Sequence, residues 1–532
     1  MSRLANRKWY HAYPENVKES LEIPEIPVYN LLETTAERNG NRTAILYEDK
    51  GISYEELKDR ADRLANVWVQ SGLRKEDRVG LMVSNQPCYI IAYYAAMKLG
   101  LIVVQINPLY TTRELIQIVN DSNVKSMVVE KRSMATFIKI EDMFQVEHVF
   151  VTYEESEKYR SIEGLIKTAS PYNGSIDIRP KEDVAVIQYT GGTTGVMKGA
   201  MLTHNNLVAN VYQSYAMYGE EMEFGKEVVL TVTPLYHVYA MTSAMNLGIY
   251  IGATVLLIKK FETEKVLEKI ERYQPTFFPG VPRMYNAFVN HENVEAYGLD
   301  SLKLCSCGSA PLPVEVIRRF EGITGAVIGE GFGLSEASPS THRNPPGGKR
   351  KAGSIGIPFP LTDCKIVDDE HAEVPAGTVG ELIIKGPQVM KGYWQNNEET
   401  DRALKNGWLY TGDLAKQDED GYFYIVGRKK EMVINGGFNV YPQEVENVLY
   451  EHPNIKECAV AGIPHPEKGE VLKAYLVPKD GAILDTEEVK GLCYRNLTPY
   501  KVPKEFEVID ELPRNTVGKI LKRMLIEKEK TN

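Results

Sequence analysis

Short runs of β-branched and other apolar residues alternate with helix-length segments along the first part of the chain. Arg78–Val83 is typical of a strand, Pro87–Leu99 of a helix and Leu101–Gln105 of a second strand. The alternation returns later, with strands expected at Asp183–Tyr189, Val228–Thr233, Thr254–Ile258 and Leu302–Cys305. Apolar strands joined by helices indicate parallel sheets with helices on both faces, so the predicted fold class is α/β.

A second part of the chain has a different pattern, which begins near residue 360. The strands expected there lie among Gly- and Asp-rich turns, as in a smaller β-subdomain: Cys364–Val367, Glu381–Lys385 and Tyr422–Val426. A chain of 532 residues is also too long for one core. We therefore predict a large N-terminal domain at 1–427, a hinge at 428–430 and a small α+β C-terminal domain at 431–532.

Composition excludes several classes of protein. The chain has 62 Lys and Arg against 72 Asp and Glu, a net charge of -10, which argues against nucleic-acid binding. Its six cysteines form no CxxC pair, which argues against a disulfide framework or a zinc site. The N-terminus has no secretion-signal pattern, so a cytoplasmic location is expected. The most apolar run, 88–106, contains Lys98 and is predicted to be a buried helix followed by a strand, with no integral membrane segment.

A loop rich in glycine and threonine follows the strand expected at Asp183–Tyr189. Its eleven residues, Tyr189-Thr-Gly-Gly-Thr-Thr-Gly-Val-Met-Lys-Gly199, contain four glycines and three threonines. Glycine lets the backbone approach a ligand closely, threonine adds hydroxyl donors, and Lys198 adds a positive charge. These parts predict a polyphosphate-binding loop, although not a Walker A loop, because no Gly-Lys precedes Ser or Thr. The alternative is a flexible surface turn, which has no need of the threonines and the lysine.

The loop resembles the phosphate loop of adenylate-forming enzymes, the superfamily of acyl-CoA synthetases, luciferases and the adenylation domains of peptide synthetases. Other motifs of that superfamily follow in order: Pro234-Leu-Tyr-His-Val-Tyr239, Gly308-Ser-Ala-Pro-Leu312, Gly331-Phe-Gly-Leu-Ser-Glu336, Trp408-Leu-Tyr-Thr-Gly-Asp413, Gly427-Arg-Lys-Lys430 and Pro513-Arg-Asn-Thr-Val-Gly-Lys519. The resemblance covers about residues 30 to 525. Asn107-Pro-Leu-Tyr110 and the segment 427–442 are most similar to bacterial long-chain fatty acyl-CoA synthetases.

The resemblance implies an ATP site built from several of these motifs. Asp413 and Arg428 are expected to bind the ribose, and Phe332 is expected to stack on adenine in place of the commoner tyrosine. Where the family usually has Ser and Pro, the loop has Gly191 and Met197. Glu330 stands where the family often has Gln or Asn. The expected ATP-binding set is Thr190, Gly191, Gly192, Thr193, Thr194, Gly195, Lys198, Gly308, Ser309, Ala310, Glu330, Gly331, Phe332, Gly333, Ser335, Asp413 and Arg428.

Magnesium and the acyl group have their own expected residues. Mg²⁺ prefers one or two oxygen ligands beside phosphate oxygens, and Glu336 with the Thr190 hydroxyl is the expected pair. The resemblance implies that the acyl group contacts a largely apolar set: His237, Tyr239, Met241, Gly280 and Gly331. His237 would position the carboxylate, although a lone histidine in an apolar stretch is more often a core residue. Met241 stands where some long-chain members have a gating tryptophan.

Two half-reactions are implied by the resemblance, and Lys519 is the main catalytic residue of the first. Its ammonium group is expected to bridge the substrate carboxylate and the α-phosphate of ATP and to offset the charge that develops. The small C-terminal domain, mobile in the family, would then turn about Lys430. Coenzyme A would enter past Gly436, Gly437 and Phe438. Some relatives have a lysine four residues after the hinge; here it is Ile434, which fits the fatty acyl-CoA subfamily.

The predicted function is therefore fatty acid–CoA ligation with ATP, Mg²⁺ and coenzyme A. Two alternatives remain open: an adenylating enzyme that transfers an acyl or aryl group to a carrier protein, and a nucleotide-binding sensor without ligase chemistry. The expected partners are the small-molecule substrates. Peripheral membrane contact and a homodimer are both compatible with the sequence.

Overall fold

The computed structural model describes residues 7–13, 17, 21–153, 158–191, 197–435, 438–465, 469–514 and 519–531. Two compact units make up the chain. The first comprises residues 1–352, 356–363 and 385–409, and the second comprises 353–355, 364–384 and 410–532. The second unit thus includes segments that the sequence analysis assigned to the large N-terminal domain, and the boundary predicted at 428–430 stays a prediction.

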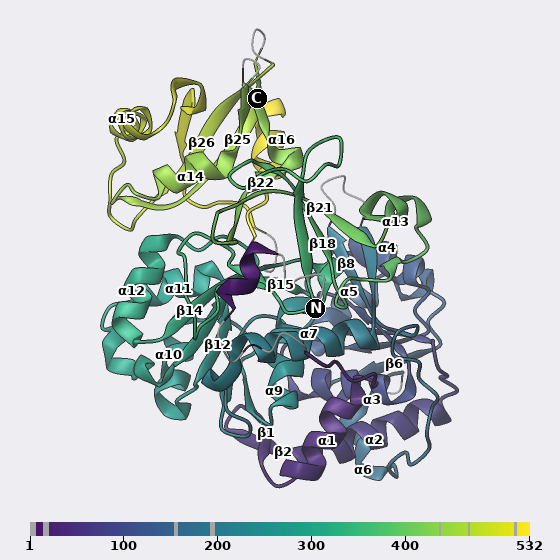
Figure 1. Cartoon of the computed structure of the whole chain (residues 1–532). Helices are drawn as coiled ribbons and strands as arrows, with labels where there is room; N and C mark the ends of the chain where they lie inside the picture. The colour runs from purple at the N-terminus through teal and green to yellow at the C-terminus, as the bar shows by residue number, and fades with distance from the viewer. Residues whose placement is uncertain are drawn as a thin grey trace. The chain divides into compact units, whose positions relative to one another are not determined.

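A nine-stranded sheet forms one half of the first unit (Figure 1). Its six middle strands are parallel, and antiparallel strands close both edges. In spatial order the strands are β16 (Ile357–Pro358), β15 (Ser340–Arg343), β14 (Val327–Gly333), β13 (Leu304–Cys307), β12 (Phe277–Gly280), β10 (Val228–Thr231), β11 (Thr254–Leu257), β1 (Thr43–Tyr47) and β2 (Lys50–Ser53).

An eight-stranded sheet forms the other half, also with a parallel centre. In spatial order its strands are β19 (Gly392–Tyr393), β9 (Met197–Thr203), β8 (Val184–Gly191), β4 (Ile102–Gln105), β3 (Arg78–Met82), β5 (Ser126–Val129), β6 (His148–Val151) and β7 (Arg160–Ser161). Strand β9 returns antiparallel to β8, so the glycine- and threonine-rich loop connects two paired strands.

Helices cover both faces of the sheets because side chains of successive strand residues point to opposite sides. Val229 and Val255 pack in a central core shared by both sheets, whereas Leu230 and Leu256 pack in an outer core. The central core holds α1 (Tyr29–Asn39), α2 (Tyr54–Gln70), α3 (Pro87–Leu99), α7 (His204–Tyr218) and α9 (Leu247–Tyr250). The outer core of the nine-stranded sheet holds α10 (Thr263–Tyr273), α11 (Pro282–Val289) and α12 (Val314–Thr324). The predicted α/β class is therefore confirmed.

Helix α3 is apolar on every side, which is the pattern of a helix enclosed by other elements. Its one charged residue, Lys98, forms an ion pair with Asp62 of α2 at 2.7 Å. The sequence prediction for this run, a buried helix followed by a strand, is confirmed by α3 and β4. Among the described residues, no helix is long and apolar enough to cross a membrane.

The remaining short helices of the first unit connect the strands. They are α4 (Thr112–Ser122), α5 (Met134–Phe137), α6 (Ile162–Thr168), α8 (Val238–Ala240) and α13 (Asn397–Ala403). Single turns of tighter helix and the π-helix η5 (Met241–Asn246) complete the unit. The six cysteines are buried and form no disulfide in the described part of the chain.

The second unit contains two smaller sheets. In the first, β17 (Asp363–Val367), β18 (Gly380–Lys385) and β21 (Trp408–Gln417) lie in that order, and β22 (Phe423–Arg428) pairs with the end of β21. The two-residue strand β20 (Leu404–Lys405) belongs to the first unit. The second sheet contains β24 (Phe438–Val440), β23 (Val433–Asn435), β26 (Gly469–Pro478), β25 (Ile455–His465) and β27 (Glu505–Val508). Its core is completed by α14 (Pro442–Leu449), α15 (Thr486–Asn496) and α16 (Lys522–Thr531).

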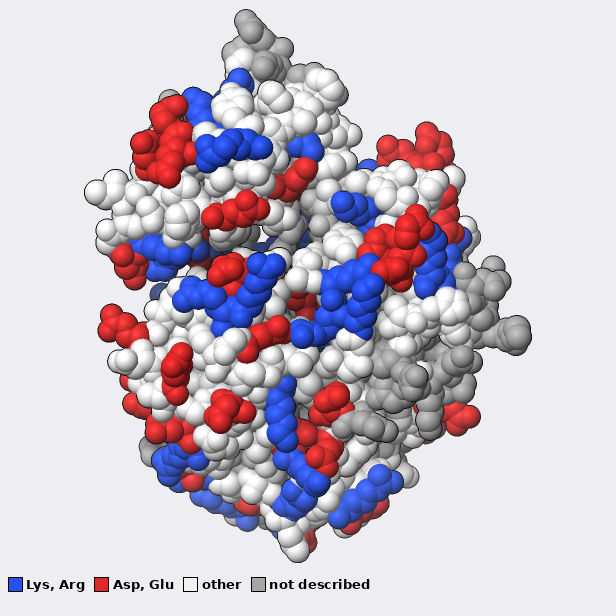
Figure 2. Space-filling view, turned by 60° about the vertical axis from the view of Figure 1, so that its left-hand side comes forward, with Lys and Arg blue, Asp and Glu red and all other residues white. Residues whose placement is uncertain are grey.

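Some expected boundaries differ from those observed. Strand β13 begins two residues later than the predicted Leu302 because Leu299–Ser301 form a turn of 3₁₀-helix. The turn between β1 and β2 is Glu48-Asp49, and both residues have a positive φ. Figure 2 shows basic and acidic side chains interspersed over the face that it draws.

Candidate functional site

The phosphate-loop residues that the structure describes lie where β8 and β9 pair. Thr190 and Lys198 are directly opposite each other, and the Thr190 hydroxyl group donates a hydrogen bond to the Lys198 carbonyl oxygen at 3.5 Å. Both side chains are half-buried. The predicted residues Gly192, Thr193, Thr194 and Gly195 lie outside the described residues, whereas Gly191 is the last residue of β8. The two ends of the loop are thus held together at the carboxyl end of β8.

Lys198 and Glu336 are connected through residues that sequence reasoning missed. Lys198 forms an ion pair with Glu399, and its hydrogen bond lowers the pKa of that carboxyl group. The Lys198 ammonium also lies 5.5 Å from the centre of the Tyr393 ring. The Tyr393 hydroxyl group donates a hydrogen bond to Glu336 at 2.8 Å, and burial followed by the Glu336 charge raises the tyrosine pKa. A cation and the expected magnesium ligand therefore share one polar cluster in the first unit.

The sequence contained a signal for the start of α13 but none for its contact with Lys198. Asn396 caps the start of α13 through a hydrogen bond from the Glu399 backbone N–H group at 3.0 Å, a pattern that predicts a helix start. Nothing in that pattern indicates that Glu399 contacts Lys198, because the two residues are 201 positions apart. Only the pairing of β19 with β9 brings Gly392–Tyr393 beside the loop.

Two expected acyl-site residues, Tyr239 and Gly280, lie close to the expected ATP-site residue Gly308 at the carboxyl ends of β12 and β13. The Tyr239 hydroxyl group contacts the Gly280 carbonyl oxygen at 3.4 Å and the Ser306 hydroxyl oxygen at 2.9 Å. A Cβ atom on Gly308 would lie 3.3 Å from the Tyr239 ring, so glycine allows that ring to cover the strand end. The structure thus brings Tyr239, Gly280 and Gly308 together.

His237 and Met241 begin helical segments beside Tyr239. The His237 Nδ1 atom accepts a hydrogen bond from the Tyr239 backbone N–H group at 3.3 Å, and the side chain is half-buried. The Met241 sulfur accepts a hydrogen bond from Gln105 at 3.0 Å, and Met241 is the first residue of the π-helix. π-Helical turns occur frequently at functional sites. The expected roles of His237 in carboxylate positioning and of Met241 in the acyl tunnel stay predictions.

The hairpin of β14 and β15 requires its glycines. A Cβ atom on Gly331 would lie 2.8 Å from the His342 carbonyl oxygen, and one on Gly333 would overlap the Pro339 carbonyl oxygen. Phe332 meets His342 edge to face at 6.0 Å. The hairpin ends next to the 3₁₀ turn Ser335–Ala337, which carries Ser335 and Glu336, while Glu330 is half-buried on β14.

Ser309 and Ala310 follow β13 and are both exposed. Ser309 has a φ of 71°, a left-handed conformation that is uncommon outside glycine. Such conformations cluster at ligand-binding sites, where the surrounding structure maintains the strain. The expected position of this motif at the nucleotide stays a prediction.

The two expected ribose ligands form an ion pair in the second unit. Asp413 on β21 and Arg428 on β22 are direct cross-strand partners, and Arg428 Nε lies 3.1 Å from Asp413 Oδ1. Asp413 is 3% exposed, and its backbone N–H group donates a hydrogen bond to the Thr411 hydroxyl oxygen at 3.1 Å. A buried carboxylate held by a cation is pre-oriented to accept hydrogen bonds from a diol.

Lys519 belongs to the same electrostatic cluster. Burial lowers its pKa, and the charges of Arg428 and Lys430 lower it further, whereas the carboxylates of Glu431 and Asp413 oppose this effect. Lys519 is half-buried, and Lys430 is exposed in the turn Lys429–Glu431. The second unit therefore brings together Lys519, Asp413, Arg428 and Lys430, which span about one hundred residues of sequence.

The segment expected to accept coenzyme A is described only in part. Gly436 and Gly437 lie outside the described residues. Phe438 is 55% exposed, and its ring stacks on Tyr500 with centroids 4.5 Å apart. Ile434 is also exposed, on the adjacent strand β23. Exposed apolar side chains of this kind offer a contact surface for a ligand.

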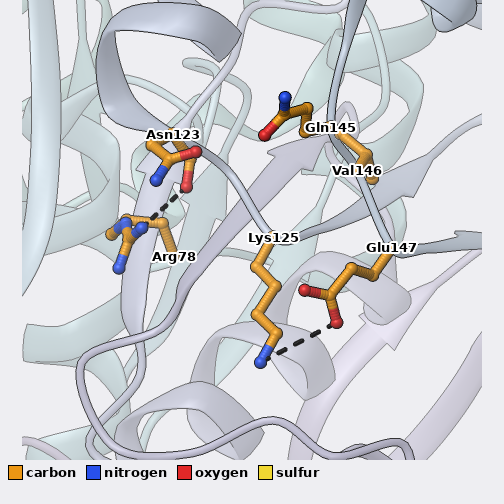
Figure 3. A pocket seen from close by; sticks show the side chains of 6 residues that line it. All are labelled: Arg78, Asn123, Lys125, Gln145, Val146 and Glu147. Carbon is orange, nitrogen blue, oxygen red and sulfur yellow. Dashed lines mark hydrogen bonds and ion pairs between the residues drawn. The ribbon is translucent and has the colours of Figure 1, made fainter.

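A cavity of about 450 Å³ lies at the amino ends of strands in the eight-stranded sheet (Figure 3), whereas the phosphate loop follows the carboxyl end of β8. Its lining includes Arg78 at the start of β3 and Lys125 just before β5, so it lies at the amino ends of parallel strands. Arg78 donates a hydrogen bond to the Asn123 carbonyl oxygen at 2.9 Å, and Lys125 lies 3.8 Å from Glu147. These cations are already paired, and the predicted site residues lie elsewhere.

No group of three or more His, Cys, Asp or Glu side chains in the described residues could hold a metal ion by itself. Magnesium that enters with a triphosphate needs fewer protein ligands, because phosphate oxygens and water complete its shell. Glu336 is half-buried and already accepts one hydrogen bond, so it fits the requirement for a single oriented carboxylate.

Comparison with known proteins gives consistent matches over nearly the whole chain. Residues 32–394 match the family of AMP-binding enzymes, and residues 444–519 match the AMP-binding enzyme C-terminal domain. A long-chain-fatty-acid–CoA ligase of Bacillus subtilis is 41% identical over 99% of both chains. A long-chain-fatty-acid–CoA ligase of Escherichia coli O6:H1 is 38% identical over 97% of both chains.

Solved structures agree with the sequence matches. The anthranilate CoA ligase AuaEII, solved in complex with anthranoyl-AMP, has a TM-score of 0.90 at 27% identity and covers 96% of this chain and 98% of its own. ATP-bound MatB from Rhodopseudomonas palustris has a TM-score of 0.86 at 31% identity and covers 95% of this chain and 99% of its own. On this full-length similarity, the chain belongs to the family of AMP-binding enzymes and is an AMP-forming acyl-CoA synthetase.

Proposed function

We propose that this protein is a fatty acid–CoA ligase that activates a medium- or long-chain fatty acid with ATP and transfers the acyl group to coenzyme A. The observation that carries the proposal is the similarity to long-chain-fatty-acid–CoA ligases over 97% or more of the chain at 38 to 41% identity. The local geometry supports it, because the cations and carboxylates that such a reaction needs are clustered in each unit.

In the first half-reaction, a carboxylate oxygen of the fatty acid attacks the α-phosphorus of ATP. The bond from that phosphorus to the bridging oxygen breaks, and pyrophosphate leaves. Thr190 and Lys198 would hold the triphosphate at the end of the β8–β9 hairpin. When phosphate binds, Lys198 would exchange its bond to Glu399 for one to the more highly charged phosphate. Glu336 would hold Mg²⁺, which neutralises phosphate charge when bound.

Lys519 would act at the reacting atoms. Its ammonium group would contact both the carboxylate and the α-phosphate, so that charge developing on phosphorus meets a fixed cation. Asp413 would accept hydrogen bonds from the ribose hydroxyl groups, with Arg428 holding the carboxylate in place. His237 would border the substrate carboxylate. A carboxylate is ionised near neutral pH and therefore needs no general base.

In the second half-reaction, the thiol of coenzyme A attacks the acyl carbonyl carbon, and the bond to AMP breaks. We propose that residues 431–532 turn about Lys430, which removes Lys519 and brings Gly436, Gly437 and Phe438 to the adenylate. One site cannot hold the Lys519 loop and the entering thiol together, so a conformational step separates the two reactions.

The proposal also includes the setting of the enzyme. A cytoplasmic location fits six cysteines that are all buried and outside disulfides in the described residues. Peripheral membrane contact would give access to fatty acids in lipid, and a homodimer is the proposed assembly. Sedimentation with lipid vesicles tests the first, and light scattering tests the second.

The test is a panel of acids, from acetate to octadecanoate with benzoate and amino acids, each supplied with ATP, Mg²⁺ and coenzyme A. Mass spectrometry identifies the products. We expect acyl-CoA, AMP and pyrophosphate in equal amounts, with the highest kcat/KM for an aliphatic acid. If the enzyme forms adenylates and transfers their acyl groups to a carrier protein but never to coenzyme A, coenzyme A is refuted as the acceptor. If the protein binds ATP but forms no AMP with any acid, the proposed ligase activity is refuted.

A further inference from the structure

Arg343, at the end of β15, is a buried cation without a counter-charge. Its side chain belongs to a residue only 3% exposed, and its Nε and Nη1 atoms have no hydrogen-bond partner. Within the described ranges, no carboxylate forms an ion pair with Arg343. Burying an unpaired charge is costly, and arginine cannot avoid the cost by losing its proton. A polar group absent from the structure is therefore expected at these two N–H groups.

The strand register places the Arg343 side chain on the predicted acyl side of the site. Arg343 is the direct antiparallel partner of Gly331, so the two residues face the same side of the sheet. Arg343 Cγ and Cδ would lie 3.5 Å from a Cβ atom on Gly329, two residues before Gly331 on that face. The side chain thus crosses a strip of glycine and extends toward the amino end of β14, away from Gly333 and Glu336.

Two aromatic rings lie beside the guanidinium, and its Nε and Nη1 atoms stay without a hydrogen-bond partner. Its central carbon lies 4.3 Å from the centre of the Tyr218 ring and 5.3 Å from that of Phe359. The positive charge also opposes the burial-driven rise in the pKa of Tyr239, the residue that covers Gly280 and Gly308. Stacking contributes to stability through the flat faces of a guanidinium, but its N–H groups lie in the plane and still need acceptors.

We propose that Arg343 binds an anionic group at the far part of the acid substrate, so that the enzyme accepts dicarboxylic acids in addition to simple fatty acids. The inference rests on the proposed function and names a substrate class for it. A carboxylate offers two acceptor oxygens in the geometry that a guanidinium edge matches. An aliphatic chain offers none and would leave the cation unmatched. The reacting carboxylate is a poorer occupant, because the side chain extends away from the nucleotide motif.

The experiment compares each dicarboxylic acid with its own monomethyl ester, from hexanedioate to hexadecanedioate. The two molecules have the same reacting carboxylate and differ at the far end only in charge. kcat/KM for both is measured with the wild type, R343M, R343K and R350M. Arg350 is a matched control, because its guanidinium is already paired with Glu321.

We expect the wild type to prefer the diacid over its monoester at one range of lengths. R343M should lower that preference on the order of 10- to 100-fold, through KM, with turnover of the monoester unchanged. R343K should restore part of the preference, and R350M should leave it intact.

Three results overturn the inference. The first is an equal preference in the wild type and R343M. The second is an equal loss of diacid and monoester activity in R343M, which assigns Arg343 to the reacting carboxylate. The third is that the wild type shows no preference for the diacid at any length. This result needs only the wild type, so it can be obtained even if R343M does not fold. A protein that forms AMP with none of these acids and with no fatty acid refutes the proposed function itself.

Discussion

Lys519 shows how the reactivity of one residue depends on charges brought from distant parts of the sequence. Its pKa is lowered by burial and by Arg428, and is held up by Glu431 and Asp413. Arg428 in turn forms the ion pair with Asp413 at 3.1 Å. Two carboxylates therefore favour the charged form of the Lys519 ammonium group, and two cations, Arg428 and Lys430, disfavour it. Small charge changes around Lys519 are expected to change its protonation.

Lys519→Ala should separate the two half-reactions. Without the ammonium group, adenylate formation should fall on the order of 100- to 1000-fold, because a fixed charge at the transition state is lost. Conversion of supplied acyl-adenylate and coenzyme A to thioester should continue. Pyrophosphate exchange and thioester formation are measured separately. Equal loss of both activities would contradict the assignment of Lys519 to the first step.

The alkaline limit of adenylation should report the pKa of Lys519. The residue acts when protonated, so activity is lost as the pH rises through its pKa, which is lowered from 10.5. Arg428→Gln removes a positive charge that disfavours the ammonium form, so the limit should move to higher pH. The pH profile of pyrophosphate exchange at saturating ATP measures this. A limit that stays in place, or moves to lower pH, would exclude Lys519 as the titrating group.

Lys519, Asp413 and Arg428 could be predicted from the sequence, because each lies in a motif that resembles a motif of the adenylate-forming enzymes. The motifs did not predict a role for Tyr393, Glu399 or Arg343. These three depend on contacts between strands and turns far apart in the chain, such as Tyr393 to Glu336 at 2.8 Å. The sequence around each gives no sign of its partner, so only the folded sheet reveals it.

At the scale of elements, the hairpin of β14 and β15 combines the nucleotide motif with the buried Arg343. Its two strands approach closely because glycine occupies the face where a side chain would meet the opposite backbone. Helix α3 and strand β4 were predictable from an unbroken apolar run, whereas the start of β13 was not, because residues 299–301 form a turn that no apolar pattern marks. Hydrophobic periodicity and composition thus predict that a helix or strand is present, whereas its first and last residues depend on the neighbouring turns.

Gly333→Ala should destabilise the first unit and weaken ATP binding. The added methyl group would overlap the Pro339 carbonyl oxygen, which belongs to the backbone and cannot move freely. A loss of about 1–3 kcal/mol is expected, as for other overpacked sites. Gly322→Ala in α12 is the control, because a Cβ atom there meets nothing within 4 Å. The control should raise stability slightly, by about 0.5–1 kcal/mol. Thermal unfolding measures both, and equal midpoints would contradict the steric argument.

At the scale of the whole molecule, the chain forms two compact units, and the hinge predicted from sequence lies within the second. The charges of Arg428 and Asp413 act on Lys519 although these residues lie on the other side of Lys430 in the sequence. A rotation about Lys430 would separate these charges, as the proposed removal of Lys519 before the thiol enters requires. Sequence predicted the α/β class and the small C-terminal sheet. It could not predict which unit holds β17 and β18, because that depends on packing.

Lys430→Pro should slow thioester formation more than adenylation, because proline fixes φ and stiffens the turn Lys429–Glu431. Lys430→Ala is the control, since it removes the charge and keeps a mobile backbone. Rapid-quench measurement of each half-reaction distinguishes them. Unchanged thioester turnover in the proline variant at saturating substrates would refute the hinge assignment.

The most direct test of the account follows oxygen-18 from the fatty acid carboxylate. Attack on the α-phosphorus, followed by transfer to coenzyme A, leaves a single labelled oxygen in the phosphate of AMP. We predict that mass spectrometry finds this label in AMP and none in pyrophosphate. Label in inorganic phosphate, with ADP as the nucleotide product, would contradict an acyl-adenylate and with it the role given to Lys519.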